Sequence, residues 1–393
     1  MAGGKRFAHL LHFGEGAGLL GAVFGIERLP KASTTLTRLL GKIETWEQAE
    51  ALAEGLWKFC FGLIPWEKEP QDYLTFDSKV LTRYGHQEGA KKGYNRKKPG
   101  RPSHHPVLAF LNQSRYVVNF WNRAGNAASS ENIVAFARQT LERLEGKASL
   151  LGVLADVAFY RSEFVHFLEE VCKLEYVIAA PFYQVVQSRC ISEKLIWRSV
   201  IEGIEVTEFW FQHRAEGWEK PRRYIVVRDD VGKVAEPLGK QLTLFGIDEL
   251  LSRKYRYRVY LVSSQEDAVA LWRRYRARAD DENRIKELGE DFGLEGFSLK
   301  KFFSTEAALL FEVFLYDLIN FFRREILPQR ENRQRAATLR YKYWAIPAIG
   351  GIRGKQLVLR LGVISKKLRA KIRYLLSRIT NGFFACGVQL QCS

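Results

Sequence analysis

The chain has 393 residues and a formal net charge of +17, because 61 Lys and Arg residues stand against 44 Asp and Glu residues. A hydrophobic share of 47% excludes a disordered or fibrous protein and predicts a large globular core. The excess of positive charge indicates a polyanionic partner, either nucleic acid or an anionic membrane surface.

Residues 1–70 are predicted to be a helical N-terminal region, which is a candidate for DNA binding. Thr45 and Gln48 have the spacing of a capping box ahead of apolar residues at helical spacing. Upstream, Gly16–Gly21 matches a dinucleotide-binding glycine pattern. That pattern requires a preceding strand and a following acidic residue, which are both missing, so we expect no nucleotide cofactor.

Residues 71–184 are predicted to form the first part of a mixed α/β sheet. Strands are expected over 73–81, 107–111, 116–121, 150–155 and 175–179, with helices over 130–144 and 162–171. Three antiparallel strands followed by parallel ones are typical of a ribonuclease-H-like core. A Gly-, Pro- and Asn-rich segment between the first two strands is predicted to be a loop, and its basic residues are Lys91, Lys92, Arg96, Lys97, Lys98 and Arg101.

Residues 185–263 are predicted to be an inserted β-rich module, with strands over 204–212, 224–228, 241–245 and 255–263. Residues 264–327 return to helices and complete the core. Charged residues interrupt the apolar helix over 305–326, which predicts a buried helix and no membrane span.

Residues 328–393 are predicted to be a basic C-terminal region. From Arg323 to Arg378 there are sixteen Lys and Arg residues and two acids, which leaves +14 in that stretch. Together with the loop cluster, this concentration favours a phosphate-binding surface for DNA, so the membrane alternative is dropped.

Three carboxylates have the setting of a metal centre. Asp77 lies within one apolar strand, and Asp156 directly follows another. Glu282 lies on a predicted helix, four residues after Arg278 and seven after Tyr275, which places these side chains on one face. A carboxylate inside a central strand is costly unless it is paired or binds a cation. Taken singly, Asp156 also fits a strand-end turn, and Glu282 with Arg278 an ordinary surface pair.

Carboxylate oxygens suit Mg²⁺, and two such ions about 4 Å apart promote phosphodiester cleavage. The five scattered cysteines lack zinc-ligand spacing and indicate a reduced, cytoplasmic protein. The N-terminus has no signal-peptide pattern. The loop pair His104 and His105 is expected to be solvated or to contact phosphate.

The sequence resembles the DDE transposases of bacterial insertion sequences, in the insertion-sequence-4 superfamily. Tyr275, Arg278 and Glu282 match the first three positions of its Tyr-x2-Arg-x3-Glu-x6-Lys signature, and Gly289 stands at the fourth. The likeness to the insertion-sequence-1380 group extends over most of the chain and is carried by the segments Tyr84–Ala90, Gly93–Asn95, Lys98–Pro106, Arg278–Leu288 and Asp291–Phe297. Leu154, Val157 and Ala158 depart from the family around the second aspartate.

This resemblance implies a cut-and-paste transposase that needs Mg²⁺, with Mn²⁺ as a substitute. Asp77, Asp156 and Glu282 would be its catalytic and metal-binding triad. The partners would be double-stranded DNA, as terminal inverted repeats and target, and a second copy of the chain in a homodimer associated with the nucleoid. Besides the loop residues named above, the expected DNA contacts are Tyr275, Arg278, Lys286, Trp218, Arg222 and Arg223, with Trp210 as an alternative to Trp218.

Two alternatives stay open at this point. One is a catalytically inactive, transposase-derived DNA-binding protein. The other is a structure-specific nuclease of the same fold, because a fold alone does not determine function.

Overall fold

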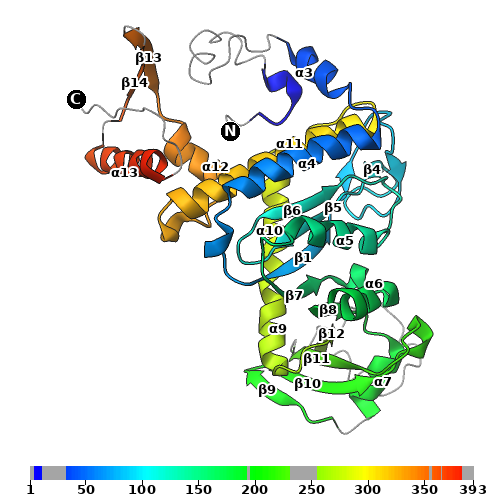
Figure 1. Ribbon diagram of the computed structural model, residues 1–393. Coiled ribbons are helices and arrows are strands. Elements are labelled where there is room, and N and C mark those ends of the chain that lie inside the picture. The colour runs from blue at the N-terminus through cyan, green and yellow to red at the C-terminus, as the bar shows by residue number, and fades with distance from the viewer. Residues whose placement is uncertain are drawn as a thin grey trace, which may run out of the picture.

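A computed structural model describes residues 4–10, 32–192, 195–230, 255–353, 356–363 and 365–382. Within these residues the protein is a mixed α/β structure built on one large mixed sheet (Figure 1). The glycine pattern at 16–21 and the predicted strand at 241–245 lie outside the described residues. In the described part of the chain, no helix is long and apolar enough to cross a lipid bilayer.

In the described residues the large sheet has nine strands in the order β6-β5-β1-β7-β8-β12-β11-β10-β9. Its first half follows the predicted pattern, since β1 pairs antiparallel with β5, β5 antiparallel with β6, and β1, β7 and β8 run parallel. The bounds of these strands are β1 Asp72–Ser78, β5 Val107–Leu111, β6 Val117–Trp121, β7 Leu150–Ala155 and β8 Glu175–Ala180.

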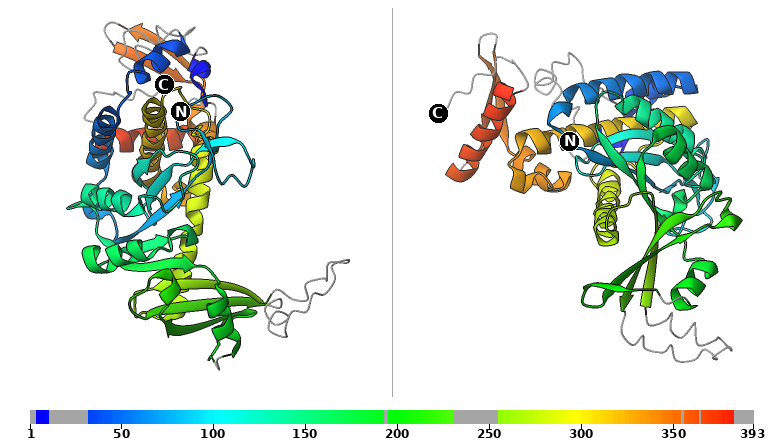
Figure 2. Two further views of the ribbon diagram at one scale, coloured as in Figure 1. Left: turned by 90° about the vertical axis from the view of Figure 1, so that its right-hand side faces the viewer. Right: turned by 60° about the horizontal axis from the view of Figure 1, so that its bottom comes forward.

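The predicted inserted module does not form a sheet of its own. Its described strands continue the core sheet, because β12 pairs antiparallel with β8. The strands are β9 Arg198–Ile201, β10 Ile204–Phe211, β11 Arg222–Asp230 and β12 Tyr255–Val262, and β9 was not predicted. Figures 1 and 2 show this part as a twisted extension at one end of the molecule. The exact domain boundaries stay a prediction.

Helices cover both faces of the sheet, and alternation along the strands decides which side chain meets which helix. Leu74 and Phe76 of β1 pack in the core cluster that includes residues of α5 and α6. Tyr73 of the same strand packs with Trp272 of α9 on the opposite face. Helix α9 continues into α10 along the sheet, and α4 lies beside α11 (Figure 1).

Helix α4 begins where the local sequence favours a start. Thr45 accepts a hydrogen bond from the Gln48 backbone, and the Gln48 side chain accepts one from the Thr45 backbone, which confirms the predicted capping box. The described α-helices are α3 Ser33–Leu40, α4 Trp46–Leu63, α5 Ile133–Leu144, α6 Ser162–His166, α7 Gln184–Ser192, α9 Ala268–Ala277, α10 Ala279–Glu290, α11 Phe302–Phe321, α12 Ala336–Leu339 and α13 Lys366–Gly382.

Shorter elements complete the described chain. Turns of 3-10 helix cover Phe7–Leu10, Trp66–Lys68, Val157–Phe159, Arg214–Glu216 and Gln329–Glu331, and π-helical turns cover Phe167–Cys172, Phe322–Ile326 and Arg340–Trp344. A small sheet has the order β2-β4-β3, with β2 Leu81–Thr82, β3 Lys91–Lys92 and β4 Pro102–His104, so the segment predicted as a loop begins with a strand. The basic C-terminal region folds into the hairpin β13 Ala348–Arg353 and β14 Gln356–Leu361, followed by α13.

Candidate active site and nucleic-acid interface

Two of the three predicted carboxylates lie at the carboxyl-terminal ends of two adjacent strands within the sheet. In the parallel pairing of β1 with β7, Phe76 lies opposite Ala155, so Asp77 and Asp156 are the next residues of adjacent strands. Strand alternation turns Asp77 to the same face as Tyr73, and Asp156 to the same face as Leu154. That face is the one covered by α9, so both carboxylates lie on the side of the sheet that carries the predicted signature helix.

Asp77 is held in an electrostatically strained setting. Its side chain is 17% exposed, and its Oδ2 lies 3.5 Å from Nη2 of Arg278. Burial raises the pKa of Asp77 to about 6, and the nearby carboxylates of Asp281 and Asp156 act in the same direction. Arg278 and the Ser78 backbone N–H, which donates to Asp77, partly oppose this shift. The site therefore favours a positive charge beside Asp77.

The start of the signature helix supplies that positive charge. Arg278 is 7% exposed, and its Nη2 also donates to the Phe76 carbonyl at 3.3 Å. The Tyr275 ring packs against Tyr260 with 4.7 Å between centroids. Burial raises the pKa of Tyr275 above its usual range, and the carboxylates of Asp77 and Asp156 add to the effect. Tyr275 and Arg278 are thus brought to the two aspartates.

The third predicted carboxylate is placed differently. Arg278 separates α9 from α10, and the Asp281 N–H donates to the Arg278 carbonyl at 2.8 Å in a three-residue turn. Such a turn is tighter than an α-helical one and rotates the following helix about its axis. Asp281 is consequently fully buried, whereas Glu282 is exposed. Glu282 would share a face with Tyr275 and Arg278 only on an unbroken helix, and its catalytic role stays a prediction.

The carboxylate oxygens of Asp77 and Asp156 supply some of the ligands that a hard divalent cation needs, but not all of them. Asp77 and Asp156 offer carboxylate oxygens on adjacent strands, and Mg²⁺ is commonly held by one or two carboxylates together with waters and substrate phosphate. Among the described residues, no three His, Cys, Asp or Glu side chains are grouped closely enough to hold a metal ion. The two aspartates are therefore the part of the triad that this arrangement supports.

The basic segment between β2 and β4 is a solvent-facing surface. Tyr84 is 68% exposed, and Lys98 lies over its ring with 4.9 Å between Nζ and the ring centroid. Within this segment, the six basic side chains of the stretch from Lys91 to Arg101 are exposed: Lys91, Lys92, Arg96, Lys97, Lys98 and Arg101. Exposed cations beside an accessible aromatic ring suit a nucleic-acid backbone and its bases.

The family described as Transposase DDE domain group 1 matches residues 26–364. The chain belongs to this family. Among solved structures it is similar to a piggyBac transposase in a synaptic complex with hairpin DNA, determined by cryo-EM, with 12% sequence identity and a TM-score of 0.37. That similarity covers 78% of this chain, which spans 58% of the length of the other. No curated protein matches the chain.

The signature of this transposase family has a basic residue at the position of Gly289. In this chain Lys79, which directly follows β1, lies in the space beside Gly289. Nζ of Lys79 donates to the Ile285 carbonyl at 3.1 Å and lies 3.2 Å from the Glu295 carboxylate. A Cβ added at Gly289 would come within 2.3 Å of that Nζ. Lys79 therefore places a cation beside position 289. The only sequence signal for this placement of Lys79 was its position two residues after Asp77.

Besides Arg278, five of the predicted DNA contacts are buried and bonded within the protein. Trp218 is 3% exposed, and its indole N–H donates to the Tyr160 hydroxyl at 3.1 Å, so it does not offer a face to a base. Trp210 is 56% exposed. The others are Arg222, which pairs with Glu169, Arg223, which pairs with Glu208, and the two histidines His104 and His105.

The two histidines were expected on a solvated loop, and burial overturns that expectation. His104 is fully buried and accepts a hydrogen bond from the Arg83 guanidinium at 3.1 Å. His105 lies 2.8 Å from the Ala127 carbonyl and 3.1 Å from the Ser78 hydroxyl. Burial lowers the pKa of both rings, to about 4 for His104, so they serve as neutral structural links. Lys286, in contrast, is 61% exposed and remains accessible to DNA.

Proposed function

We propose that the chain is a DNA transposase that cuts element ends and joins them to target DNA, and that it belongs to the insertion-sequence-1380 group of the insertion-sequence-4 superfamily. The observation that carries this proposal is the placement of Asp77 and Asp156 on adjacent strand ends opposite Arg278. Membership of the transposase family indicates the class of reaction, and Asp77 and Asp156 supply carboxylates that suit it.

The sheet order supports a ribonuclease-H-like core. Three antiparallel strands precede two parallel ones, and β1 lies between β5 and β7 at the junction of the two patterns. The first aspartate comes from β1 and the second from the end of β7. In this arrangement the two carboxylates come from the middle of the sheet, where neighbouring strands hold their positions.

Asp77 and Asp156 are the residues that would hold Mg²⁺ or Mn²⁺, and we propose Glu282 as the third carboxylate on the basis of the signature. When bound, such ions promote attack on a phosphodiester and stabilise the leaving oxygen. Arg278 neutralises Asp77 in the absence of other cations. If Asp77 held such a cation, the Arg278 guanidinium would be available to bind a phosphate oxygen.

Positive charge around this centre would hold the DNA. The exposed segment from Lys91 to Arg101 offers one phosphate-binding surface, and the exposed basic side chains of the C-terminal region, among them Arg330, Lys366 and Arg373, offer another. Figure 2 shows the C-terminal hairpin and α13 at the end of the molecule away from β9–β12. We propose that a homodimer brings two DNA ends to two such centres.

A second candidate is a DNA-binding protein that has lost catalysis. It is favoured by the exposed position of Glu282 and by the lack, among the described residues, of a group of three carboxylates that could hold a metal ion. The basic surfaces serve this function equally well.

The test is incubation of the protein with a duplex that carries its terminal inverted repeat, in Mg²⁺ or Mn²⁺, followed by separation of the strands. Cleavage and joining are expected, and Asp77→Ala or Glu282→Ala should abolish both while leaving DNA binding intact. Binding without cleavage by the unmodified protein would establish the second candidate. Cleavage without joining would indicate a nuclease and contradict the transposase proposal.

A further inference from the structure

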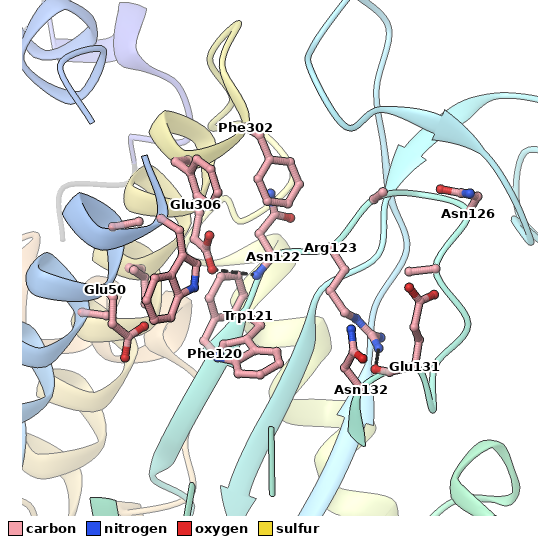
Figure 3. Close-up of a pocket in the computed structure, with 17 residues that line it drawn as sticks. Glu50, Phe120, Trp121, Asn122, Arg123, Asn126, Glu131, Asn132, Phe302 and Glu306 are labelled. Carbon is pink, nitrogen blue, oxygen red and sulfur yellow. Dashed lines mark hydrogen bonds between the residues drawn. The ribbon is translucent and has the colours of Figure 1, made fainter. Parts of the chain in front are cut away.

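A cavity of about 330 Å³ lies between α4, the loop that follows β6 and the start of α11 (Figure 3). Its walls carry the carboxylates of Glu50 and Glu306, which accept hydrogen bonds as a phosphate does and therefore do not suit one. Arg123 also lines it, but the Nη1 atom of that residue is bonded to backbone carbonyls. Cations outside the cavity are better placed to hold DNA at the aspartates, and Lys79 is the one closest in sequence to Asp77.

Lys79 lies on the same side of the sheet as Asp77. Its backbone N–H donates to the Pro106 carbonyl at 3.0 Å, which continues the antiparallel pairing of β1 with β5 by one residue. Alternate residues of an extended strand share a face, so the side chains of Asp77 and Lys79 follow one another on the face covered by the signature helix. The contact with α10 agrees with this, because Nζ of Lys79 donates to the Ile285 carbonyl at 3.1 Å.

The ammonium group of Lys79 keeps bonding capacity. A lysine ammonium has three N–H donors. Within the described residues, its partners are the Ile285 carbonyl and the Glu295 carboxylate, which lies 3.2 Å from Nζ. The Lys79 side chain is 13% exposed and that of Glu295 is 56% exposed. An ion pair with one partner largely in solvent is weak, so a phosphate oxygen can bind the remaining donor or take the place of Glu295.

Gly289 determines how closely this ammonium group approaches α10. A Cβ at position 289 would lie 2.3 Å from Nζ of Lys79, so a side chain there would displace the ammonium group. The bond to the Ile285 carbonyl therefore depends on the absence of a side chain at 289. In this way α10 holds the cation in a fixed position beside the strand that carries Asp77.

Lys79 also connects the basic segment between β2 and β4 with the aspartates. Burial lowers the pKa of Lys79, Glu295 opposes this shift, and the positive charge of Lys97 adds to it. Lys97, an exposed residue of that segment, is thus close enough for its charge to act on Lys79. On the other side, Arg278 lies at Asp77. Cations are therefore present at the basic segment, at Lys79 and at Arg278, as binding of successive phosphates of one strand requires.

We propose that Lys79 binds a phosphate of the DNA strand, next to the phosphate that lies at Asp77 and Asp156. The bond to the Ile285 carbonyl holds the ammonium group in place, while the Glu295 carboxylate gives way to the phosphate. This role rests on the DNA binding of the proposed function. It does not require catalysis, so it applies equally to a chain that binds DNA without cutting it.

The first experiment locates the phosphate. Terminal-repeat duplexes that each carry one uncharged methylphosphonate near the end are titrated with the protein in Ca²⁺, which carboxylates also bind. One of these substitutions should weaken binding by the unmodified protein by about tenfold. The same methylphosphonate should have no effect on Lys79→Met, because the charge that it would deprive of a partner is already absent.

Lys147→Met is the matched control for this titration. Nζ of Lys147 donates to the Arg143 carbonyl at 2.9 Å, so it too bonds the end of a helix. Lys147 precedes β7, whereas Asp156 follows that strand at its other end. Lys147→Met should therefore lose the same affinity as the unmodified protein when the methylphosphonate is introduced.

The second experiment moves the cation from one element to another. Lys79→Met removes Nζ, and a Cβ at position 289 would be at an ordinary contact distance, 3.5 Å, from the Cε position of residue 79. Lys79→Met combined with Gly289→Lys should regain most of the lost affinity. Gly289→Gln in the same background should not, because it replaces the glycine in the helix without adding a charge.

The ion pair gives a third comparison with the opposite sign. Glu295→Gln removes the carboxylate that competes for Lys79 and should strengthen DNA binding. Glu290→Gln removes the same charge at a side chain 52% exposed near the end of α10, and its effect should be smaller. If Lys79→Met does not fold in urea-unfolding controls, this comparison decides, because Glu295 is largely in solvent.

A methylphosphonate effect that persists undiminished in Lys79→Met would overturn the role of Lys79. So would a failure of Gly289→Lys to restore affinity, or equal effects of the two glutamate substitutions. If the unmodified protein does not bind the terminal-repeat duplex at all, the proposed function is wrong and the role of Lys79 with it. Cleavage is not measured in these experiments, so a chain that binds without cutting still tests Lys79.

Discussion

Arg284 should be among the most sensitive positions in the protein, because it neutralises a buried acid beside the candidate site. It is 1% exposed, pairs with the fully buried Asp281 at 2.8 Å and donates to the Leu111 carbonyl at 3.1 Å. Arg284→Met keeps much of the volume but leaves Asp281 without its cation. Removing one partner of a buried pair costs about 3–5 kcal/mol. We therefore expect a loss of about 4 kcal/mol in the free energy of unfolding.

The loss should depend on pH in a defined direction. Burial raises the pKa of Asp281, and Arg284 opposes that shift, so the substitution raises the pKa of Asp281 further. A carboxyl with a raised pKa in the folded state stabilises the fold less as pH increases, so Arg284→Met should be more damaging at pH 8 than at pH 5. Adding Asp281→Asn to Arg284→Met should recover about 2 kcal/mol, because no uncompensated charge remains.

Urea unfolding followed by tryptophan fluorescence at both pH values measures these changes. Arg274→Met is the control, since the Arg274–Glu266 pair is partly exposed, at 27% and 45%, and should contribute at most about 1 kcal/mol. A loss below about 1 kcal/mol for Arg284→Met, or a double variant no more stable than the single one, would refute the assigned role of the pair.

Two further predictions concern a buried acid and the basic surface. Burial raises the pKa of Glu312 to about 8, so the folded state favours the protonated acid and its stability should fall as pH rises from 5 to 8. In urea titrations, the free energy of unfolding of Glu312→Gln should fall between pH 5 and pH 8 by on the order of 3 kcal/mol less than that of the unmodified protein. The same pH dependence in both proteins would contradict the assignment of Glu312 as a buried, protonated acid. In DNA-binding titrations over salt, Lys97→Gln combined with Lys98→Gln should reduce the slope of log K against log salt by about 2, whereas Lys173→Gln, at a residue 68% exposed on another surface, should not.

The regular parts of the fold were predictable from local patterns. Thr45 and Gln48 specified the start of α4 because a capping box satisfies backbone donors that the helix itself leaves free. The apolar strand before Asp156 placed that residue at the end of β7, where the structure has it. Local periodicity was sufficient in both cases, because the determining contacts are close in sequence.

Features that depend on tertiary contacts were not predictable. Asp281 is buried and Glu282 is exposed after a tight turn at Arg278, and helical periodicity does not detect such a turn. His104 was expected on a loop, either solvated or in contact with phosphate, yet Arg83 and the small sheet bury it. The strands of the predicted module joined the core sheet through pairing with β8, which sequence patterns within each strand do not specify.

We propose that the aspartates on adjacent strand ends carry out metal-dependent DNA cleavage. The most direct measurement is the rate of strand cleavage on a terminal-repeat duplex in Mg²⁺ for Asp156→Asn, compared with Asp280→Asn, whose acid pairs with Arg115 at 2.9 Å. We predict that Asp156→Asn binds the duplex but no longer cleaves it, while Asp280→Asn cleaves at nearly the unmodified rate. Undiminished cleavage by Asp156→Asn would contradict the proposed site.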